Sequence, residues 1–314
     1  MAGGQERLLR RRIKSVEATK KITRAMELIA ASQMGRARAR LLGTRPYVHA
    51  VERVLAMSAE DATHASRILG VPESVERSLI VTIVGDRGLC GAYNSSVLRF
   101  AERLMLTEEP NGRTYRIVGV GKKAIAFFRY RNRAIEHVFT GMSDRPSFED
   151  ARRVAAEVIR PFISGEVDLV ELVSTRFVST GTQVVERRQI LPLVVEGEAT
   201  EREESSGADG FYDFEPSSEE LLELLVPQYA EVFLYQAMLE ASASEHTARQ
   251  RAMAAATENA EELITTLSRI MNRARQDSIT TEIMEIVSGA EALRNVGKAV
   301  REELLRDDNE EQIA

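Results

Sequence analysis

The chain has 314 residues, 44% of them hydrophobic, and a formal net charge of −6. This is enough apolar material to bury an ordinary core, while the modest net charge identifies no partner. A single cysteine, Cys90, excludes an internal disulfide and fits a reducing compartment, and no apolar run approaches the ~20 residues that span a bilayer. We therefore expect no direct bilayer insertion, although docking on a membrane complex stays possible.

The first 57 residues are predicted to form one long helix of a coiled coil, because apolar side chains recur every three or four residues. The predicted seam runs through Leu9, Ile13, Val16, Ile22, Met26, Ile29, Met34, Ala37 and Leu41. The helix is strongly basic: its first 45 residues hold twelve Arg and Lys against three Glu. Three interpretations of this charge stay open, namely a solvated basic face, contact with nucleic acid, or a place inside an acidic protein cavity.

Residues 78–195 have a different pattern, in which short β-branched runs alternate with amphipathic helices. Strands are predicted at Ser78–Val84, Tyr115–Val120, Asp168–Thr175 and Thr182–Ile190, and helices at Asn94–Thr107, Lys122–Arg131 and Ser147–Ile163. Alternation of this kind indicates a layered α/β domain with a parallel sheet. The last strand follows a short turn, so it is predicted to pair antiparallel as a hairpin.

The stretch 196–212 is acidic and poor in apolar residues, and is predicted to be a mobile loop. Residues 213–314 are predicted to form a second coiled-coil helix, from about Ser217 to about Arg301 and on the order of 125 Å long, followed by an acidic tail. Its three-four spacing from Val232 to Ala274 is thin in leucines, since Ser242, His246 and Arg249 stand in the seam. The negative charges of the tail predict fraying of the helix near Leu305.

Two glycine-containing turns suggest phosphate binding but depart from the known patterns. In GDRGLCGAYN, Gly85 to Asn94, the glycine spacing is not GxGxxG, and in VGVGKKA, Val118 to Ala124, a lysine replaces the Ser or Thr that holds magnesium. Cys90 has no histidine near it in sequence, and the four histidines are scattered singly. We expect no catalytic residue, no metal site and no cofactor.

Three segments carry a family resemblance: RIKSVEATKKITRAMELIAASQM (Arg12 to Met34), DRGLCGAYN (Asp86 to Asn94) and NRARQDSITTEIMEIVSGAEAL (Asn272 to Leu293). In this order they closely resemble the gamma subunits of F-type rotary ATP synthases. The fold implied is of the mixed α+β and α/β class: a long antiparallel coiled coil of N- and C-terminal helices with an inserted Rossmann-like α/β domain. The function implied is a non-catalytic rotor shaft that couples ion flow through a membrane ring to ATP synthesis or hydrolysis.

The resemblance also implies partners and contact residues. The partners are the alpha and beta subunits of the catalytic ring, an epsilon subunit and the membrane c-ring, at the cytoplasmic face of a bacterial membrane. By motif position, Arg275 and Gln276 match a pair that binds a catalytic subunit, with Thr280 and Glu282 beside it and Met26 on the opposite helix. The segment FYDFEP (Phe211 to Pro216) makes Tyr212 and Glu215 candidates for contact with the membrane ring.

Two other classes of function compete with this interpretation. A nucleotide-binding α/β enzyme would use the Gly85–Gly91 turn, and a nucleic-acid-binding coiled coil would use the basic N-terminal helix. Against the second, Tyr47 is the first aromatic residue, well past most of the charges. The chain also continues beyond Leu293, where the family usually ends, and the role of residues 294–314 stays open.

Overall fold

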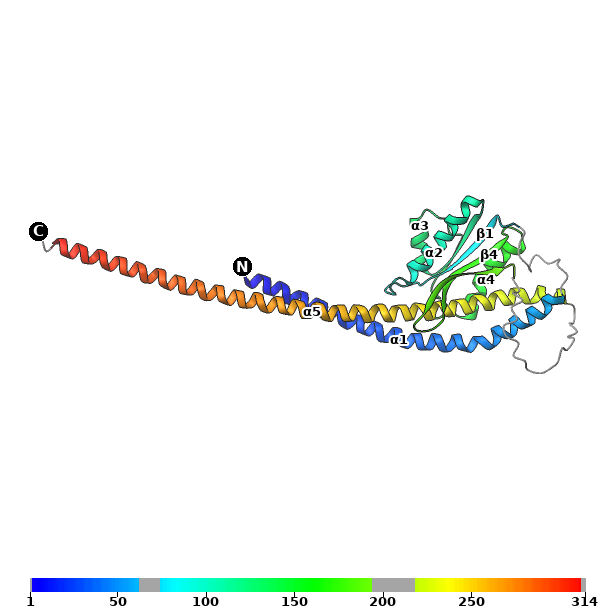
Figure 1. The fold of residues 1–314 in the computed structure, drawn as a ribbon, viewed down its shortest axis with the longest axis horizontal. Helices are drawn as coiled ribbons and strands as arrows, with labels where there is room; N and C mark the ends of the chain where they lie inside the picture. The colour runs from blue at the N-terminus through cyan, green and yellow to red at the C-terminus, as the bar shows by residue number, and fades with distance from the viewer. Residues whose placement is uncertain (1, 62–73, 194–217, 312–314) are drawn as a thin grey trace. The chain divides into compact units, whose positions relative to one another are not determined.

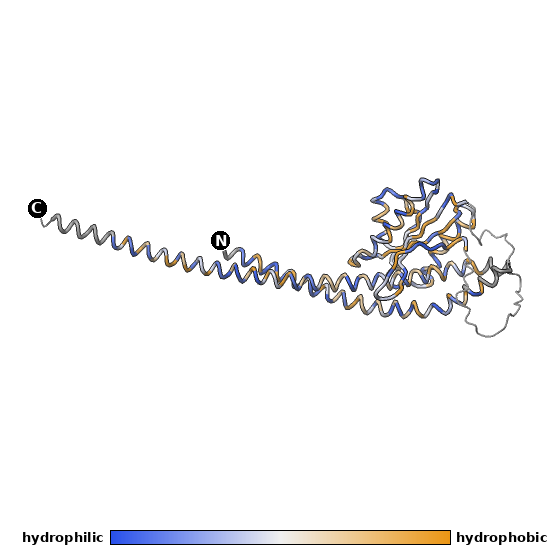
Figure 2. Tube along the Cα trace, in the orientation of Figure 1, coloured by the Kyte–Doolittle hydropathy of each residue, from blue (hydrophilic) through white to orange (hydrophobic). Residues whose placement is uncertain are grey.

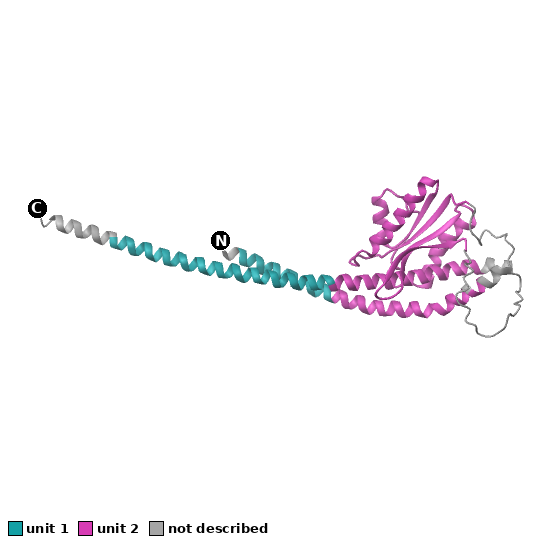
Figure 3. Ribbon diagram, in the orientation of Figure 1, with its two compact units in different colours: residues 1–24, 255–314 teal, residues 25–254 magenta. Residues whose placement is uncertain are grey.

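The computed structural model describes residues 2–61, 74–193 and 218–311. It divides into two compact units, one formed by residues 1–24 and 255–314 and the other by residues 25–254 (Figure 3). Two helices contribute to both units: α1, Ala2–Asp61, and α5, Ser218–Glu311. The segments 196–212 and 312–314, with Tyr212 and Glu215, lie outside the described residues.

The larger unit contains one five-stranded sheet in the order β3-β2-β1-β4-β5. Its strands are β1, Arg77–Ile83; β2, Thr114–Val120; β3, His137–Phe139; β4, Leu169–Phe177; and β5, Gln183–Leu191. The first four are parallel, whereas β5 pairs antiparallel with β4, as the predicted hairpin requires. The short β3 was not predicted from the sequence, because three residues are too few to show the alternation of apolar and polar side chains that indicates a strand.

Helices cover both faces of this sheet (Figure 1). Helices α2, Tyr93–Glu108, and α3, Lys122–Tyr130, pack on one face around Ile80, Phe128 and Val173. Helix α4, Phe148–Ile163, and the first part of α5 pack on the other face. Ser147 caps α4 through a reciprocal pair of hydrogen bonds with Asp150, which fixes where that helix begins. Hydrophobic residues gather in the strands at the centre of the domain, although β5 also carries Glu186, Arg187 and Arg188 (Figure 2). The predicted three-layer α/β domain is confirmed.

Within each unit α1 and α5 run antiparallel. In the smaller unit the hydroxyl oxygens of Thr23 and Thr257 lie 2.8 Å apart, and Lys20 forms an ion pair of 2.8 Å with Glu261. In the larger unit Ala37 and Leu41 pack against Leu239 and Ala243. The predicted antiparallel pairing of the terminal helices is therefore confirmed.

The seam of α1 differs from the predicted one by a position in places. Ile22 and Ile29 are 61% exposed, whereas their neighbours Thr23 and Ala30 are buried. With Ala37 these form a seven-residue repeat of small side chains, which lets two helix backbones approach closely. The prediction was right for Ala37, but it placed Ile22 and Ile29 in the seam instead of Thr23 and Ala30, because it used apolar size as the guide and close approach favours small residues.

Helix α5 runs through Glu311, so fraying at Leu305 is not found. The dipole penalty of an acidic last turn is a few tenths of a kcal/mol to about 1 kcal/mol, too little to end a helix of this length.

Candidate functional site

The carboxyl ends of the parallel strands meet at one edge of the sheet, where an α/β domain ordinarily binds a ligand. Here the edge is closed by Asp86, in the turn after β1. Its carboxylate accepts hydrogen bonds from the backbone N–H groups of Lys122 (3.0 Å), Gly141 (2.8 Å) and Ser143 (3.3 Å). The Asp86 N–H in turn donates to the Ser143 hydroxyl at 2.9 Å. One carboxylate thus links the turns that follow β1, β2 and β3.

The N-terminus of α3 is therefore not available to a phosphate. Its first N–H groups are already bonded: Lys122 to Asp86, Lys123 to the Gly85 carbonyl at 3.2 Å, and Ala124 to the Gly121 carbonyl at 3.2 Å. A Cβ at Gly121, which has φ +105°, would stand 2.1 Å from the Val84 carbonyl oxygen. This glycine serves close backbone packing between two turns rather than the approach of a ligand.

The turn itself is held by Asn94, the second residue of α2. The Gly85 N–H donates to the Asn94 side-chain oxygen at 2.7 Å, and the Asn94 amide nitrogen donates to the Arg87 carbonyl at 3.2 Å and to the Cys90 Sγ at 3.1 Å. Cys90 is buried, and burial raises the pKa of its thiol. A protonated, buried thiol is a packing group and not a nucleophile.

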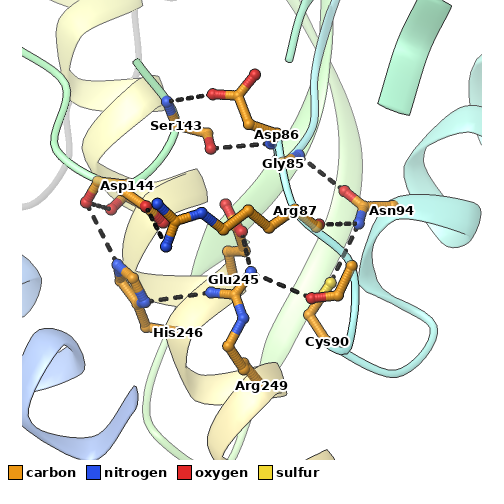
Figure 4. Close-up of polar contacts among 12 residues, drawn as sticks. Gly85, Asp86, Arg87, Cys90, Asn94, Ser143, Asp144, Glu245, His246 and Arg249 are labelled. Atoms are coloured by element: carbon orange, nitrogen blue, oxygen red, sulfur yellow. Dashed lines mark hydrogen bonds and ion pairs between the residues drawn. The ribbon is translucent and has the colours of Figure 1, made fainter. Parts of the chain in front are cut away.

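Polar residues of α5 are buried against this edge of the sheet (Figure 4). Ser242, Glu245, His246 and Arg249, at most 7% exposed, lie on one face of the helix. Glu245 and Arg249 form an ion pair within the helix. Burial raises the pKa of Glu245, whereas Arg249 opposes this shift. Three of the four, Ser242, His246 and Arg249, are the residues that make the predicted coiled-coil seam poor in leucines, and all four are buried against the loops of the sheet.

The histidine of this group has a defined tautomer. Its Nδ1 lies 3.4 Å from Arg249 Nη1, and its Nε2 lies 3.3 Å from the Asp144 carbonyl oxygen. A guanidinium can only donate, so Nδ1 accepts and Nε2 carries the proton. Burial lowers the pKa of His246, which favours this neutral form.

The same edge opens into a pocket of about 700 Å³ beside α1. Met26, one of the predicted contact residues, is half-buried in its wall. Arg87, Arg145 and Arg249 line the pocket as well. Asp144 also lines it and pairs with Arg87, and Arg249 is paired with Glu245, so the charges around Met26 are largely balanced.

Four more of the predicted contact residues lie on α5 in the smaller unit. Arg275, Gln276, Thr280 and Glu282 are all exposed. The Thr280 hydroxyl donates to the Gln276 carbonyl at 3.0 Å, and the Ser278 hydroxyl donates to Glu282 at 3.4 Å. Among the residues that the structure describes, nothing covers the helix surface that carries Arg275.

Two kinds of residue were missed by sequence reasoning. The buried Glu245 carries no apolar signal, although its position four residues before Arg249 could have suggested an ion pair within a helix. Asp86 was read only as part of a glycine turn, and nothing local in the sequence indicates its three backbone partners.

No group of three or more His, Cys, Asp or Glu side chains placed to hold a metal ion occurs among the residues that the structure describes. Within the same ranges, no helix is long and apolar enough to cross a membrane.

Comparison with known proteins identifies the family. The family model described as ATP synthase matches residues 5–293. The ATP synthase gamma chain of Parafrankia sp. (strain EAN1pec) is 45% identical over 296 residues, covering 92% of this chain and 98% of that protein. The ATP synthase gamma chain of Kineococcus radiotolerans is 44% identical over 299 residues, covering 94% and 98% respectively.

Solved structures share the fold. A chain of the Euglena gracilis mitochondrial ATP synthase rotor superposes with a TM-score of 0.63 at 20% identity, covering 88% of this chain and 99% of that chain. A chain from the OSCP/F1/c-ring structure of the same enzyme gives a TM-score of 0.64 at 19% identity, covering 93% and 95%. The predicted gamma subunit is confirmed in preference to a nucleotide-binding enzyme or a nucleic-acid-binding coiled coil. By its sequence, the chain belongs to the family of ATP synthase gamma chains.

Proposed function

We propose that this chain is the rotor shaft of an F-type ATP synthase and carries no catalytic site of its own. The observation that carries the proposal is the exposed apolar surface of α5 beyond its pairing with α1. Every residue from 279 to 298 is exposed, including Ile279 at 48%, Ile286 at 72% and Leu293 at 75%. Large apolar side chains in such a contiguous stretch mark a surface that a partner covers.

The partner proposed for this stretch is the ring of three alpha and three beta subunits. Within it the apolar end of α5 would turn as in a bearing. A single asymmetric helix pair cannot contact three identical subunits identically, so it holds each in a different state. Rotation of the shaft exchanges those states and couples torque to nucleotide binding without chemistry in the shaft.

Arg275 and Gln276 are proposed to bind a loop of one beta subunit, with Thr280 and Glu282 next to them. Their exposure supports this assignment, and a planar guanidinium makes the directional, bidentate contacts that a dwell position requires. Met26 is proposed to face the ring from α1.

The lower end of the shaft is proposed to bind the epsilon subunit and the membrane c-ring. Tyr212 and Glu215, assigned to the ring by motif position, stay part of this proposal. The complex would then hold the chain at the cytoplasmic face of a bacterial membrane, as a peripheral subunit.

Co-expression with the alpha, beta and epsilon subunits tests the proposal. We expect an affinity-tagged chain to co-purify with them, to show no ATP turnover alone, and to restore ATP-driven ion pumping when the assembly is joined to its membrane sector. A chain that hydrolyses ATP by itself, or an assembly that pumps equally well without it, would contradict the proposal.

A further inference from the structure

The inference concerns the four buried polar residues of α5, Ser242, Glu245, His246 and Arg249, here named the α5 clamp. They recur at a spacing of three and four residues, so they form one strip along the helix. This strip continues the apolar face with which α5 covers the sheet, formed by Val226, Ala230, Leu234, Ala237, Met238 and Ala241. At Ser242 this face of α5 changes from apolar to polar, next to the buried Glu240, which pairs with Arg188 of β5 at 3.0 Å.

The residues of the α5 clamp form hydrogen bonds with two different loops. Toward the turn after β1, Arg249 Nη2 donates to the Gly88 carbonyl at 3.4 Å. Toward the loop after β3, the Asp144 carbonyl accepts from the Ser242 hydroxyl at 3.1 Å and from His246 Nε2 at 3.3 Å. The Arg249 guanidinium, the His246 ring and that carbonyl therefore form one chain of donors and acceptors (Figure 4).

The two loops are themselves joined. Arg87 forms an ion pair of 3.2 Å with Asp144, and Asp86 accepts hydrogen bonds from the backbone of Gly141 and Ser143. The α5 clamp therefore contacts two loops that are joined to each other, so a shift of one loop would also disturb the other.

The polar contacts of the α5 clamp are directional, whereas the packing of the apolar face is not. Apolar packing is non-directional, and three of the six fully buried residues of that face are alanines, with Tyr229, Phe233 and Tyr235 packed beside them only partly buried. Hydrogen bonds weaken steeply once their angle is lost. A buried ion pair adds little net stability over apolar residues of the same size, but it defines one geometry.

We propose that the α5 clamp fixes the rotational position of α5 against the α/β domain, so that torque passes between them without slip. This rests on the proposed function as a rotor shaft. Ser242, Glu245, His246 and Arg249 act as positioning residues: they set the rotational position of α5 against the loops that they contact.

The test replaces both charges at once. In Glu245→Met/Arg249→Met neither charge is left unpaired, so the purified chain should melt at or above the wild-type temperature. We expect the assembled complex to lose ions pumped per ATP hydrolysed. A merely structural role would change the melting temperature and leave this ratio as in the wild type.

The control is Glu109→Met/Arg133→Met, which removes a less buried ion pair beside α2 and α3, the helices on the face of the sheet opposite α5. Its pumping ratio should equal that of the wild type. If Glu245→Met/Arg249→Met does not fold, Arg249→Lys decides, since it keeps a positive charge near Glu245 but loses the planar fork that reaches Gly88 and His246.

A wild-type pumping ratio in Glu245→Met/Arg249→Met, or in Arg249→Lys where that variant decides, overturns the inference. Equal losses in the control and the clamp variant overturn it too. If the wild-type chain itself fails to support pumping in the assembly, the proposed function fails, and that outcome is distinct from a failure of the clamp alone.

Discussion

The carboxylate of Glu245 lies directly against the backbone of Gly85. A Cβ built on Gly85 would stand 2.8 Å from the Glu245 carboxyl carbon, and 2.8 Å and 3.0 Å from its two oxygens. Because Glu245 is 1% exposed and paired with Arg249, the carboxylate has no room to retreat without breaking the ion pair. Gly85, which follows β1, therefore leaves the space that the Glu245 side chain of α5 occupies. The glycine serves this close packing and not the binding of a phosphate.

A double-mutant cycle measures this contact. Gly85→Ala should destabilise the wild-type chain by about 1 to 3 kcal/mol, the usual cost of overpacking a buried contact. In a Glu245→Ala background the same substitution should cost much less, since the clashing atoms are gone. Chemical denaturation of the four proteins gives both values. An equal cost in the two backgrounds would show that the strain at Gly85 arises elsewhere.

Arg275→Ala should weaken coupling between hydrolysis and rotation while leaving the fold intact. The side chain is exposed, so its truncation should change the free energy of unfolding by no more than roughly 0.5 kcal/mol. Torque and ions pumped per ATP are the measurements, with Arg273→Ala, an exposed arginine two positions earlier, as the matched control. Unchanged torque in Arg275→Ala, or equal losses in both variants, would count against the proposed contact.

Met26→Lys should lower coupling efficiency, and the structure supplies a local reason. Lysine would bring a further positive charge into a pocket whose arginines already form ion pairs, Arg87 with Asp144 and Arg249 with Glu245, and would compete for those carboxylates. We expect Met26→Leu, which keeps the volume without charge, to pump normally. Raising the salt concentration should partly restore coupling in Met26→Lys by screening. A large fall in melting temperature with normal pumping would assign the effect to packing alone.

The sequence predicted the elements far better than it predicted their contacts. Strands β1, β2, β4 and β5 and helices α2 to α4 lie within two residues of the predicted ranges, because each has a periodicity or an end signal that is local. The three-residue β3 has neither. The seam of α1 was shifted from Thr23 to Ile22 because apolar size was used as the guide, whereas the helix pair selects small residues.

The site shows the same limit. The thin seam at Ser242, His246 and Arg249 was visible in the sequence, but the group that the seam faces was not. That group is the Asp144 carbonyl and the Gly88 carbonyl, 102 and 161 residues away from their partners on α5. Contacts between a helix face and distant backbone carbonyls leave no pattern in a single sequence.

The neutral His246 makes stability depend on pH in a definite direction. It faces Arg249 on its own helix, Arg40 of α1 and Asp144 of the loop after β3, and burial holds its pKa below the ordinary value of 6.5. The unfolded chain therefore binds a proton in a pH range where the folded chain does not. It follows that the stability contributed by the neutral ring is present above about pH 6.5 and is lost as the pH falls below it.

His246→Gln tests this dependence. The glutamine amide can donate to the Asp144 carbonyl as Nε2 does, but it does not titrate. We expect the melting temperature of the wild type to fall more steeply than that of His246→Gln as the pH is lowered from 7.5 through 6.5 to 5.5, with the curves parallel above neutrality. Glu245 acts in the opposite sense, since its raised pKa removes stability as the pH rises above its ordinary value of 4.5, and it is present in both proteins. The difference between the two curves therefore isolates the histidine, and parallel curves throughout would mean that the pKa of His246 is the same in the folded and the unfolded chain, which would contradict the lowered pKa.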